Sequence, residues 1–194
     1  MKICLATNNH KKIEEIKYKL GDNFEILSLS DIGYHDELPE NQKTLEGNSL
    51  EKAEFIYKNF QIDCIADDTG LEVVALDGEP GVYSSRYAGP QKNSEDNMDL
   101  LLENMQDKTD RRAQFRTVIT LIRSGKTRQF EGLIKGKIAT ERHGTLGFGY
   151  DPIFIPKGYE KTFGEMSLAE KNDISHRGIA VEKLCQFLKK KIRD

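Results

Sequence analysis

The sequence has no long apolar run, and this absence argues against a membrane-spanning helix. No stretch of its 194 residues approaches the roughly 20 consecutive apolar residues that a helix needs to cross a bilayer. The N-terminus also lacks the longer apolar region of a secretory signal, because the short run Lys2 to Ala6 leads at once into polar Thr7. We therefore expect a cytoplasmic protein with no membrane partner.

Cysteine is scarce, and neither sign of charge is in large excess. Cys4, Cys64 and Cys185 lie far apart without a C-x-x-C spacing, so they suggest neither a disulfide framework nor a zinc site. We expect each to be a reduced core residue. The formal net charge of -3 gives no overall attraction to nucleic acid or anionic lipid, and a small anionic ligand fits better.

Along the sequence, short apolar runs typical of strands alternate with segments whose apolar residues recur at helical spacing. On a chain that is 37% hydrophobic and 31% charged, this alternation predicts one continuous α/β fold with a mixed sheet. The length suits a single domain, residues 1–194, with a second lobe near the expected hairpin. We expect strands over residues 2–6, 24–29, 64–66 and 71–76, a β-hairpin over 114–134, and helices around 13–20, 50–60, 98–105 and 180–188.

The first polar motif, Thr7 to Lys12, lies between an expected strand and an expected helix. A helix N-terminus offers unpaired N–H groups and a partial positive charge, and small polar residues with lysines there suit a phosphate chain. The motif lacks the glycines of a Walker loop. The structural alternative is an ordinary N-cap followed by solvated lysines.

The second motif, Asp67-Asp68-Thr69-Gly70, follows the apolar run Cys64 to Ala66, so we expect the acidic pair at a strand end. Adjacent carboxylates repel each other, and hard oxygen ligands are what Mg²⁺ needs when it bridges a protein to phosphates. Glu40 or Glu46 from the preceding segment could complete such a metal site. The alternative is a D-x-x-G turn with ordinary capping.

The third motif, Thr145 to Pro152, is rich in glycine and carries Phe148 and Asp151. Glycine lets the backbone approach a flat ligand, Phe148 can stack on a base, and Asp151 can hydrogen-bond to its polar edge. The pattern indicates a nucleobase slot. A glycine-rich turn with a buried aromatic anchor is the alternative.

The fourth motif runs from Ser167 to Gly178 and opens with a capping-box pattern, Ser167 with Glu170. Lys171, His176 and Arg177 then concentrate hydrogen-bond donors that suit a purine 6-oxo group or a phosphate. A solvated basic face is the alternative.

In their order along the chain, these motifs resemble those of the inosine triphosphate pyrophosphatases, also called noncanonical purine NTP pyrophosphatases. The matching stretches spread from residue 6 to residue 178, and FGYDP followed by EKNDISHR is highly specific. They read ATNNHKKIEEI, ADDTGLEV, PGVYSSRYAG, FGYDPIF and AEKNDISHRG.

The resemblance implies a two-lobed α/β fold with a long mixed central sheet flanked by helices, a nucleotide cleft between the lobes, and a homodimer. It implies Mg²⁺-dependent hydrolysis of ITP, dITP and XTP to the monophosphate and pyrophosphate. Asp68 would be the catalytic carboxylate that orients or deprotonates the attacking water, and the metal ligands would be Asp68, Asp67 and Glu40. The substrate-binding residues would be Thr7, Asn8, Asn9, His10, Lys11, Lys12, Lys52, Thr69, Phe148, Gly149, Tyr150, Asp151, Lys171, His176 and Arg177.

The chain departs from the family pattern at one position. The family often has glutamate immediately before the asparagine of its helix motif, whereas Gly47 precedes Asn48 here and the acid falls one residue earlier, at Glu46. The second metal ligand therefore stays open between Glu40, Glu46 and Asp67.

Two other functions compete with this hypothesis. A related pyrophosphatase could act on other altered nucleotides, including pyrimidines. A non-catalytic nucleotide-binding or RNA-binding module is disfavoured by the acidic balance, by the lack of a basic-aromatic stripe and by the intact Asp67-Asp68 pair. Selectivity for deaminated purines would come from donors aimed at O6, where adenine presents an amino group.

Overall fold

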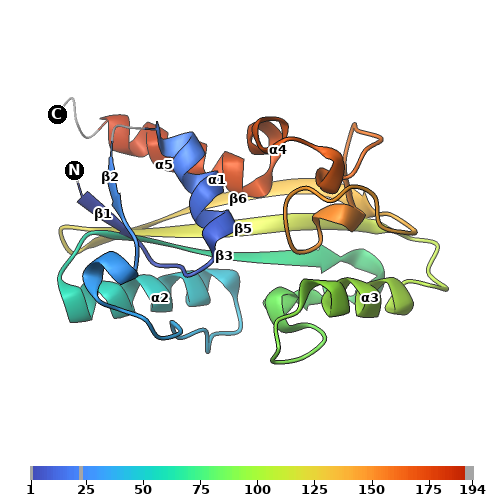
Figure 1. Cartoon of the computed structure of the whole chain (residues 1–194), viewed down its shortest axis with the longest axis horizontal. Coiled ribbons are helices and arrows are strands. Elements are labelled where there is room, and N and C mark those ends of the chain that lie inside the picture. Colours follow the sequence, from blue (N-terminus) through green and yellow to red (C-terminus); the bar gives the residue numbers. More distant parts are fainter. Residues whose placement is uncertain (1, 22–23, 191–194) are drawn as a thin grey trace. The chain divides into compact units, whose positions relative to one another are not determined.

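The computed structural model describes residues 2–21 and 24–190, and within them the strands form a mixed sheet flanked by helices (Figure 1). The strand order is β2-β1-β3-β5-β6-β7, with β4 paired to β3 off this path. The pairs β1–β2 and β1–β3 are parallel, whereas β3–β4 and β6–β7 are antiparallel. The predicted α/β class with a mixed sheet is confirmed.

The elements follow the expected order along the chain. The strands are β1 (Lys2–Leu5), β2 (Glu25–Leu27), β3 (Cys64–Val73), β4 (Pro80–Gly81), β5 (Arg112–Arg123), β6 (Lys126–Ile138) and β7 (Phe154–Pro156). The helices are α1 (His10–Leu20), α2 (Leu45–Phe60), α3 (Ser94–Asn104), α4 (Leu168–Ile174) and α5 (His176–Lys190). No helix in the described part of the chain is long and apolar enough to cross a membrane.

The chain divides into two compact units. Unit 1 comprises residues 1–68, 117–132 and 177–194, and unit 2 comprises residues 69–116 and 133–176. Strands β3, β5 and β6 contribute residues to both units, so the boundary runs through three strands.

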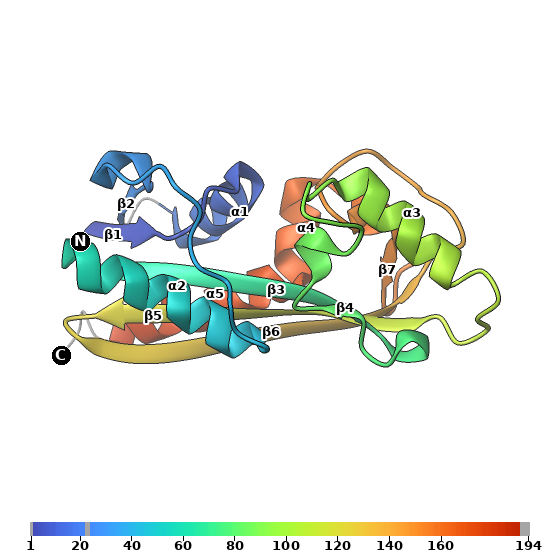
Figure 2. The same ribbon diagram turned by 90° about the horizontal axis from the view of Figure 1, so that it is seen from below.

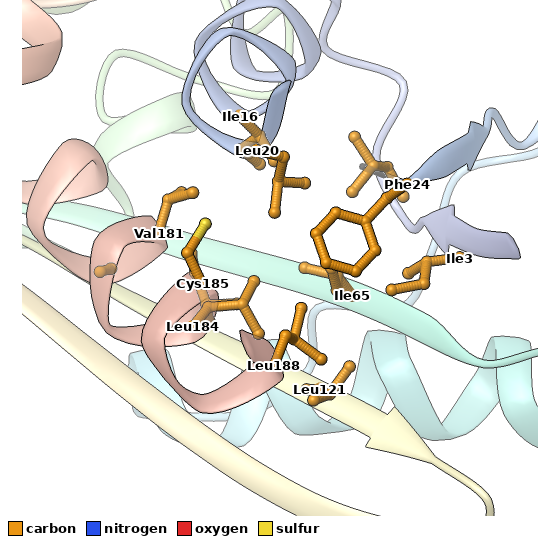
Figure 3. Close-up of a cluster of buried hydrophobic side chains, with 13 residues drawn as sticks. Ile3, Ile16, Leu20, Phe24, Ile65, Leu121, Val181, Leu184, Cys185 and Leu188 are labelled. Carbon is orange, nitrogen blue, oxygen red and sulfur yellow. The ribbon is translucent and has the colours of Figure 1, made fainter. Parts of the chain in front are cut away.

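In unit 1, helices cover both faces of the sheet, with α1 and α5 on one side and α2 on the other (Figure 1). Ile65 of β3 belongs to one buried cluster with Ile16 of α1 and Leu184 of α5 (Figure 3). On the opposite face, Cys64 and Ala66 pack in a second cluster with residues of α2. Burial on both faces explains why the start of β3 is continuously apolar. As expected, the three cysteines are buried and free.

In unit 2, a third cluster forms the core, and β7 pairs with the end of β6 as a short strand (Figure 2). Leu71 and Val73 of β3 pack there with Met98 and Leu101 of α3. The remaining members include Phe115, Ile138, Tyr150, Phe154 and Phe163.

The expectation that the acidic pair ends a strand is wrong. We expected a strand at 64–66, a turn, and a second strand from residue 71, but β3 is one strand, Cys64–Val73, with Asp67 and Asp68 in its middle. Asp and Gly are common in turns, yet here neighbouring elements supply partners for the buried carboxylates, so the strand continues. Gly70 allows β4 to approach closely, because a Cβ there would lie 2.7 Å from the carbonyl oxygen of Gly81.

Candidate active site

The pleat of β3 sends the two adjacent carboxylates to opposite faces of the sheet. Successive side chains of a strand alternate, so Asp68 shares the face of Ala66, which packs against α2, and Asp67 shares the face of Ile65, which packs against α1 and α5. Both carboxylates are buried. Their closest described partners therefore come from different helices, whereas the charges of Lys12 and Lys52 act on both carboxylates.

Asp68 is held by two residues of α2. The Lys52 ammonium lies 3.3 Å from Asp68 Oδ1 and 2.6 Å from Glu40 Oε1. Asn48 donates from Nδ2 to Asp68 Oδ2 at 3.1 Å, and its own Oδ1 accepts the backbone N–H of Gln42 at 2.8 Å. Asn48 and Lys52 are four residues apart, so they lie on one face of the helix. The first half of α2 therefore places an amide and an ammonium on the same carboxylate.

Burial sets the electrostatics of this cluster. Burial raises the pKa of Asp68 above its ordinary value and outweighs the opposing effect of the Lys52 charge. Burial alone would lower the pKa of Lys52, but Asp68 and Glu40 reverse this and raise it. Lys52 therefore stays charged, while Asp68 is a carboxylate with increased proton affinity, as a general base requires.

Asp67 is a charged anchor on the opposite face. Its Oδ2 lies 3.0 Å from Lys12 Nζ and 3.3 Å from Arg177 Nη2, and Arg177 also pairs with Glu15. Burial alone would raise the pKa of Asp67, but Lys12 and Arg177 hold it below its ordinary value. Arg177 is 1% exposed. Its guanidinium is thus held inside unit 1 by two carboxylates.

The segment Thr7 to Lys12 leads into α1 through an ordinary N-cap, which was the structural alternative for this motif. Asn9 is the N-cap, and its Oδ1 accepts the backbone N–H groups of Lys11 and Lys12 at 3.0 and 3.2 Å. Asn8, Asn9, His10 and Lys11 are exposed. Lys12 differs from a solvated lysine, because its side chain is half-buried against Asp67. One cation of the motif is therefore fixed beside the carboxylates.

The oxygen donors around Lys52 suit a magnesium ion. Within residues 2–21 and 24–190, no group of three or more His, Cys, Asp or Glu side chains could hold a metal by itself. Mg²⁺ usually takes only one or two carboxylates and completes its shell with water and substrate phosphates. Asp68 and Glu40, which share one ammonium, are such a pair. Glu46 lies in the first turn of α2, where its charge complements the helix dipole.

In unit 2, two of the expected base-reading residues, Phe148 and Asp151, lie beside a third, Lys171. Lys171 Nζ lies 2.5 Å from Asp151 Oδ2 and 4.8 Å from the centre of the Phe148 ring. The same Asp151 oxygen accepts the backbone N–H of Phe148 at 2.8 Å. The ring of His176 is stacked on Phe115, with centroids 4.5 Å apart. Phe148, Asp151 and Lys171 therefore form one cluster that combines an aromatic face with polar groups.

Tyr150 and Thr69 complete the placement of the predicted residues. Tyr150 is buried, and its hydroxyl donates to the carbonyl oxygen of Ser84 at 2.8 Å, which ties the FGYDP loop to the PGVYSSRYAG segment. Gly149 adjoins it with a φ of 61°. Thr69 follows Asp68 in β3 and is half-buried.

Sequence reasoning missed three residues that hold the site together: Asn48, Glu15 and Ser84. The first two carry a signal in their spacing. Asn48 precedes Lys52 by four residues and Glu15 follows Lys12 by three, so each shares a helix face with a predicted site lysine. Ser84 acts through its backbone carbonyl, for which a sequence gives no signal.

The comparisons with known proteins converge on one family. The Ham1 family model matches residues 3–187. A dITP/XTP pyrophosphatase of Flavobacterium psychrophilum is 52% identical over 189 residues, which cover 97% of this chain and all of that protein. A dITP/XTP pyrophosphatase of Porphyromonas gingivalis is 50% identical over 96% of this chain and 97% of that protein.

Solved structures agree. The Staphylococcus aureus Ham1 protein superposes with a TM-score of 0.90 at 40% identity and covers 98% of this chain and 100% of its own. A HAM1 protein from Coxiella burnetii gives a TM-score of 0.90 at 35% identity over 98% of this chain and 99% of its own.

Proposed function

Because the chain belongs to the Ham1 family, we propose that it is a nucleoside-triphosphate pyrophosphatase that hydrolyses ITP, dITP and XTP to the monophosphate and pyrophosphate. Such an activity removes deaminated purines from the nucleotide pool. The structural observation that carries the proposal is the buried Asp68 carboxylate, held by Lys52 and Asn48 and joined to Glu40 through one ammonium. A preference for other altered nucleotides is the competing possibility, and a panel of triphosphates separates the two.

The residues of unit 1 would carry the hydrolysis. Asp68 would orient or deprotonate the water that attacks the α-phosphorus. Mg²⁺ held by Asp68 and Glu40 would neutralise phosphate charge and lower the pKa of bound water. Lys12, anchored by Asp67, and Lys52 would contact the phosphates.

The residues of unit 2 would bind the base. Phe148 offers a stacking face, and Lys171, with Asp151 beside it, offers a donor for the purine O6. Adenine presents an amino group at that position, so the buried ammonium would face another donor. We assign Arg177 to positioning, because Asp67 and Glu15 already hold its guanidinium.

The decisive experiment is pyrophosphate release measured with ITP, dITP, XTP, GTP and ATP over a magnesium titration.

Asp68→Asn keeps the size of the side chain and removes its charge, so we expect kcat for ITP to fall by about 10²- to 10⁴-fold in a folded protein. The matched control is Glu54→Gln, a half-buried acid of α2 that pairs with Lys58 and lies outside the proposed site. A folded Asp68→Asn variant with near wild-type kcat at saturating magnesium would remove Asp68 from the mechanism.

We further propose that the protein is a cytoplasmic homodimer. The family resemblance supports the dimer, and three free buried cysteines fit a reducing compartment. Light scattering should give about twice the monomer mass; a monomer at micromolar concentration would refute the dimer and leave the enzymatic proposal intact.

A further inference from the structure

Unit 2 contains a cavity of about 750 Å³ that shares no residue with the site proposed above. It lies on the sheet face turned away from the core of unit 2, because its lining residues Gln114 and Ile155 alternate with the core residues Phe115 and Phe154. Pockets that bind small molecules have volumes of about 300–1,000 Å³. The cavity is therefore large enough for a ligand of nucleotide size.

Three lysines gather at this cavity: Lys135, Lys137 and Lys157. Lys135 and Lys137 are two residues apart in β6, so their side chains share one face of the strand. The register of β6 and β7 pairs Lys137 with Ile155, and the backbone N–H of Lys157 donates to the carbonyl oxygen of Lys135 at 2.8 Å. Lys157 therefore lies opposite Lys135, on the same face.

No acidic side chain among residues 2–21 and 24–190 neutralises these lysines. In the part of the chain that the structure describes, none of the three forms an ion pair. Glu72 also lines the cavity, but Gln114 donates to its Oε2 at 2.6 Å and Arg116 donates to its Oε1 at 3.2 Å. Like charges directly opposite each other on paired strands are destabilising. An anion bound among the lysines would relieve this repulsion.

The cavity also offers apolar surface beside the lysines. Val74 and Tyr159 line it and are 52% and 43% exposed, so their apolar surface is available to a ligand. Ile155 contributes further apolar lining. We propose that this cavity binds a small organic anion whose phosphate, sulfonate or carboxylate group contacts the three lysines and whose ring-sized apolar body packs against Val74 and Tyr159.

The same lysines disfavour a second copy of the chain as the occupant. In a two-fold interface the same patch of each subunit meets near the axis. If that axis passed through the cavity, the three lysines of one subunit would lie beside the three lysines of the other. The charge pattern favours an anionic small molecule.

Binding of naphthalene-2-sulfonate, an anion with an apolar body, tests the proposal by calorimetry with the wild type and a cavity variant. We expect one equivalent to bind, and Lys135→Gln/Lys157→Gln to weaken binding roughly three- to tenfold. The matched control, Lys108→Gln/Lys126→Gln, removes the same charge at exposed lysines outside the cavity and should bind as the wild type does.

A second readout needs no ligand. Removal of the like-charge contact should raise the Tm of Lys135→Gln/Lys157→Gln by on the order of 1 °C, while the control pair leaves it unchanged. Turnover of ITP should be the same in all variants, because no cavity lysine belongs to the proposed catalytic site.

Three outcomes would overturn the proposal. The first is equal binding of the sulfonate by the wild type and the Lys135→Gln/Lys157→Gln variant, or no binding at millimolar probe. The second is binding of plain sulfate as tightly as the sulfonate, which would mean that the apolar lining plays no part. The third is a change of oligomeric mass in the variant, which would show that a second copy covers this face.

Discussion

Asn48 fixes the orientation of the Asp68 carboxylate and is itself fixed by the backbone. Its Oδ1 accepts the N–H of Gln42, so its Nδ2 must point to Asp68 Oδ2 and the amide cannot reverse. Asn48→Asp keeps the acceptor for Gln42 and loses the donor to Asp68. We expect kcat for ITP to fall by about 10- to 100-fold, the usual effect of removing a residue that orients a site carboxylate.

The control for Asn48 is Gln42→Ala, because Asn48 uses only the backbone N–H of Gln42. Steady-state kinetics with circular dichroism make the comparison. A kcat within twofold of wild type for folded Asn48→Asp would mean that Asp68 needs no orienting amide.

Substitutions at two neighbouring glycines, Gly147 and Gly149, would distinguish the cost of backbone strain from the cost of a steric clash. Gly147 and Gly149 have φ values of 74° and 61°, which side chains rarely adopt. A Cβ on Gly147 would clash with the Asp151 carboxylate, whereas a Cβ on Gly149 meets nothing within 4 Å. Gly149→Ala should therefore cost only about 1–2 kcal/mol of unfolding free energy.

Gly147→Ala should cost more than Gly149→Ala, because it adds displacement of Asp151 to the same backbone strain. Asp151 accepts from Lys171, so we expect kcat/KM for ITP to fall further in Gly147→Ala than in Gly149→Ala. Urea denaturation and steady-state kinetics measure both effects. Equal losses in the two variants would show that Asp151 adapts to the added methyl group.

At the scale of elements, the sequence predicted most helices and strands but misjudged β3. The apolar spacing of α2 and the hairpin turn at Ser124 and Gly125 were visible because these signals are local, and both turn residues have positive φ. The continuity of β3 through Asp67 and Asp68 depends on partners that are distant in sequence. Lys12 and Arg177 compensate Asp67 from α1 and α5, which no local pattern reveals.

The same limit applies to the site residues. Their motifs indicated phosphate, metal and base chemistry, and Lys12, Lys52, Asp68 and Lys171 are indeed buried or half-buried among opposite charges. The sequence could not show that Arg177 has carboxylate partners in unit 1, because Glu15 lies 162 residues away.

The N-terminus of α4 gives a prediction of pH dependence. Glu170 closes the predicted capping box, which is confirmed; hydrogen bonds from Lys161 and Ser167 lower its pKa from 4.5 to about 2. A lowered folded-state pKa contributes stability above the unfolded value, and this contribution is lost as pH falls through the folded value. The stabilisation is thus present above 4.5 and disappears towards about 2.

Glu170→Gln should therefore lower the Tm at about pH 6 and have a shrinking effect as pH falls towards about 2. Thermal unfolding across this range measures the difference from wild type. Glu103→Gln, at an exposed position of α3, serves as the control. A pH-independent difference for Glu170→Gln would assign the effect to hydrogen bonding alone.

At the scale of the whole molecule, neither unit is a continuous segment of chain. Unit 1 consists of three segments, and β3, β5 and β6 run from one unit into the other. Loss of order in one half of such a strand releases the backbone of the other half. Because the units share these strands, we expect a single cooperative unfolding transition.

Hydrogen exchange followed by mass spectrometry tests this cooperativity. Amides of β3 in unit 1, such as Ile65, and in unit 2, such as Leu71, should exchange with the same opening free energy. Two well-separated free energies would mean that the units unfold independently despite their shared strands.

The alternation of Asp67 and Asp68 has a consequence for how this gene can change. Substitution at most positions of β3 alters one side chain, but insertion or deletion of one residue between Ile65 and Asp67 would exchange the faces of everything beyond it. The carboxylate now beside Lys52 would then point towards α1 and α5, and the partner of Lys12 and Arg177 would point towards α2. Homologous sequences should therefore show substitutions within this strand but hardly ever insertions or deletions.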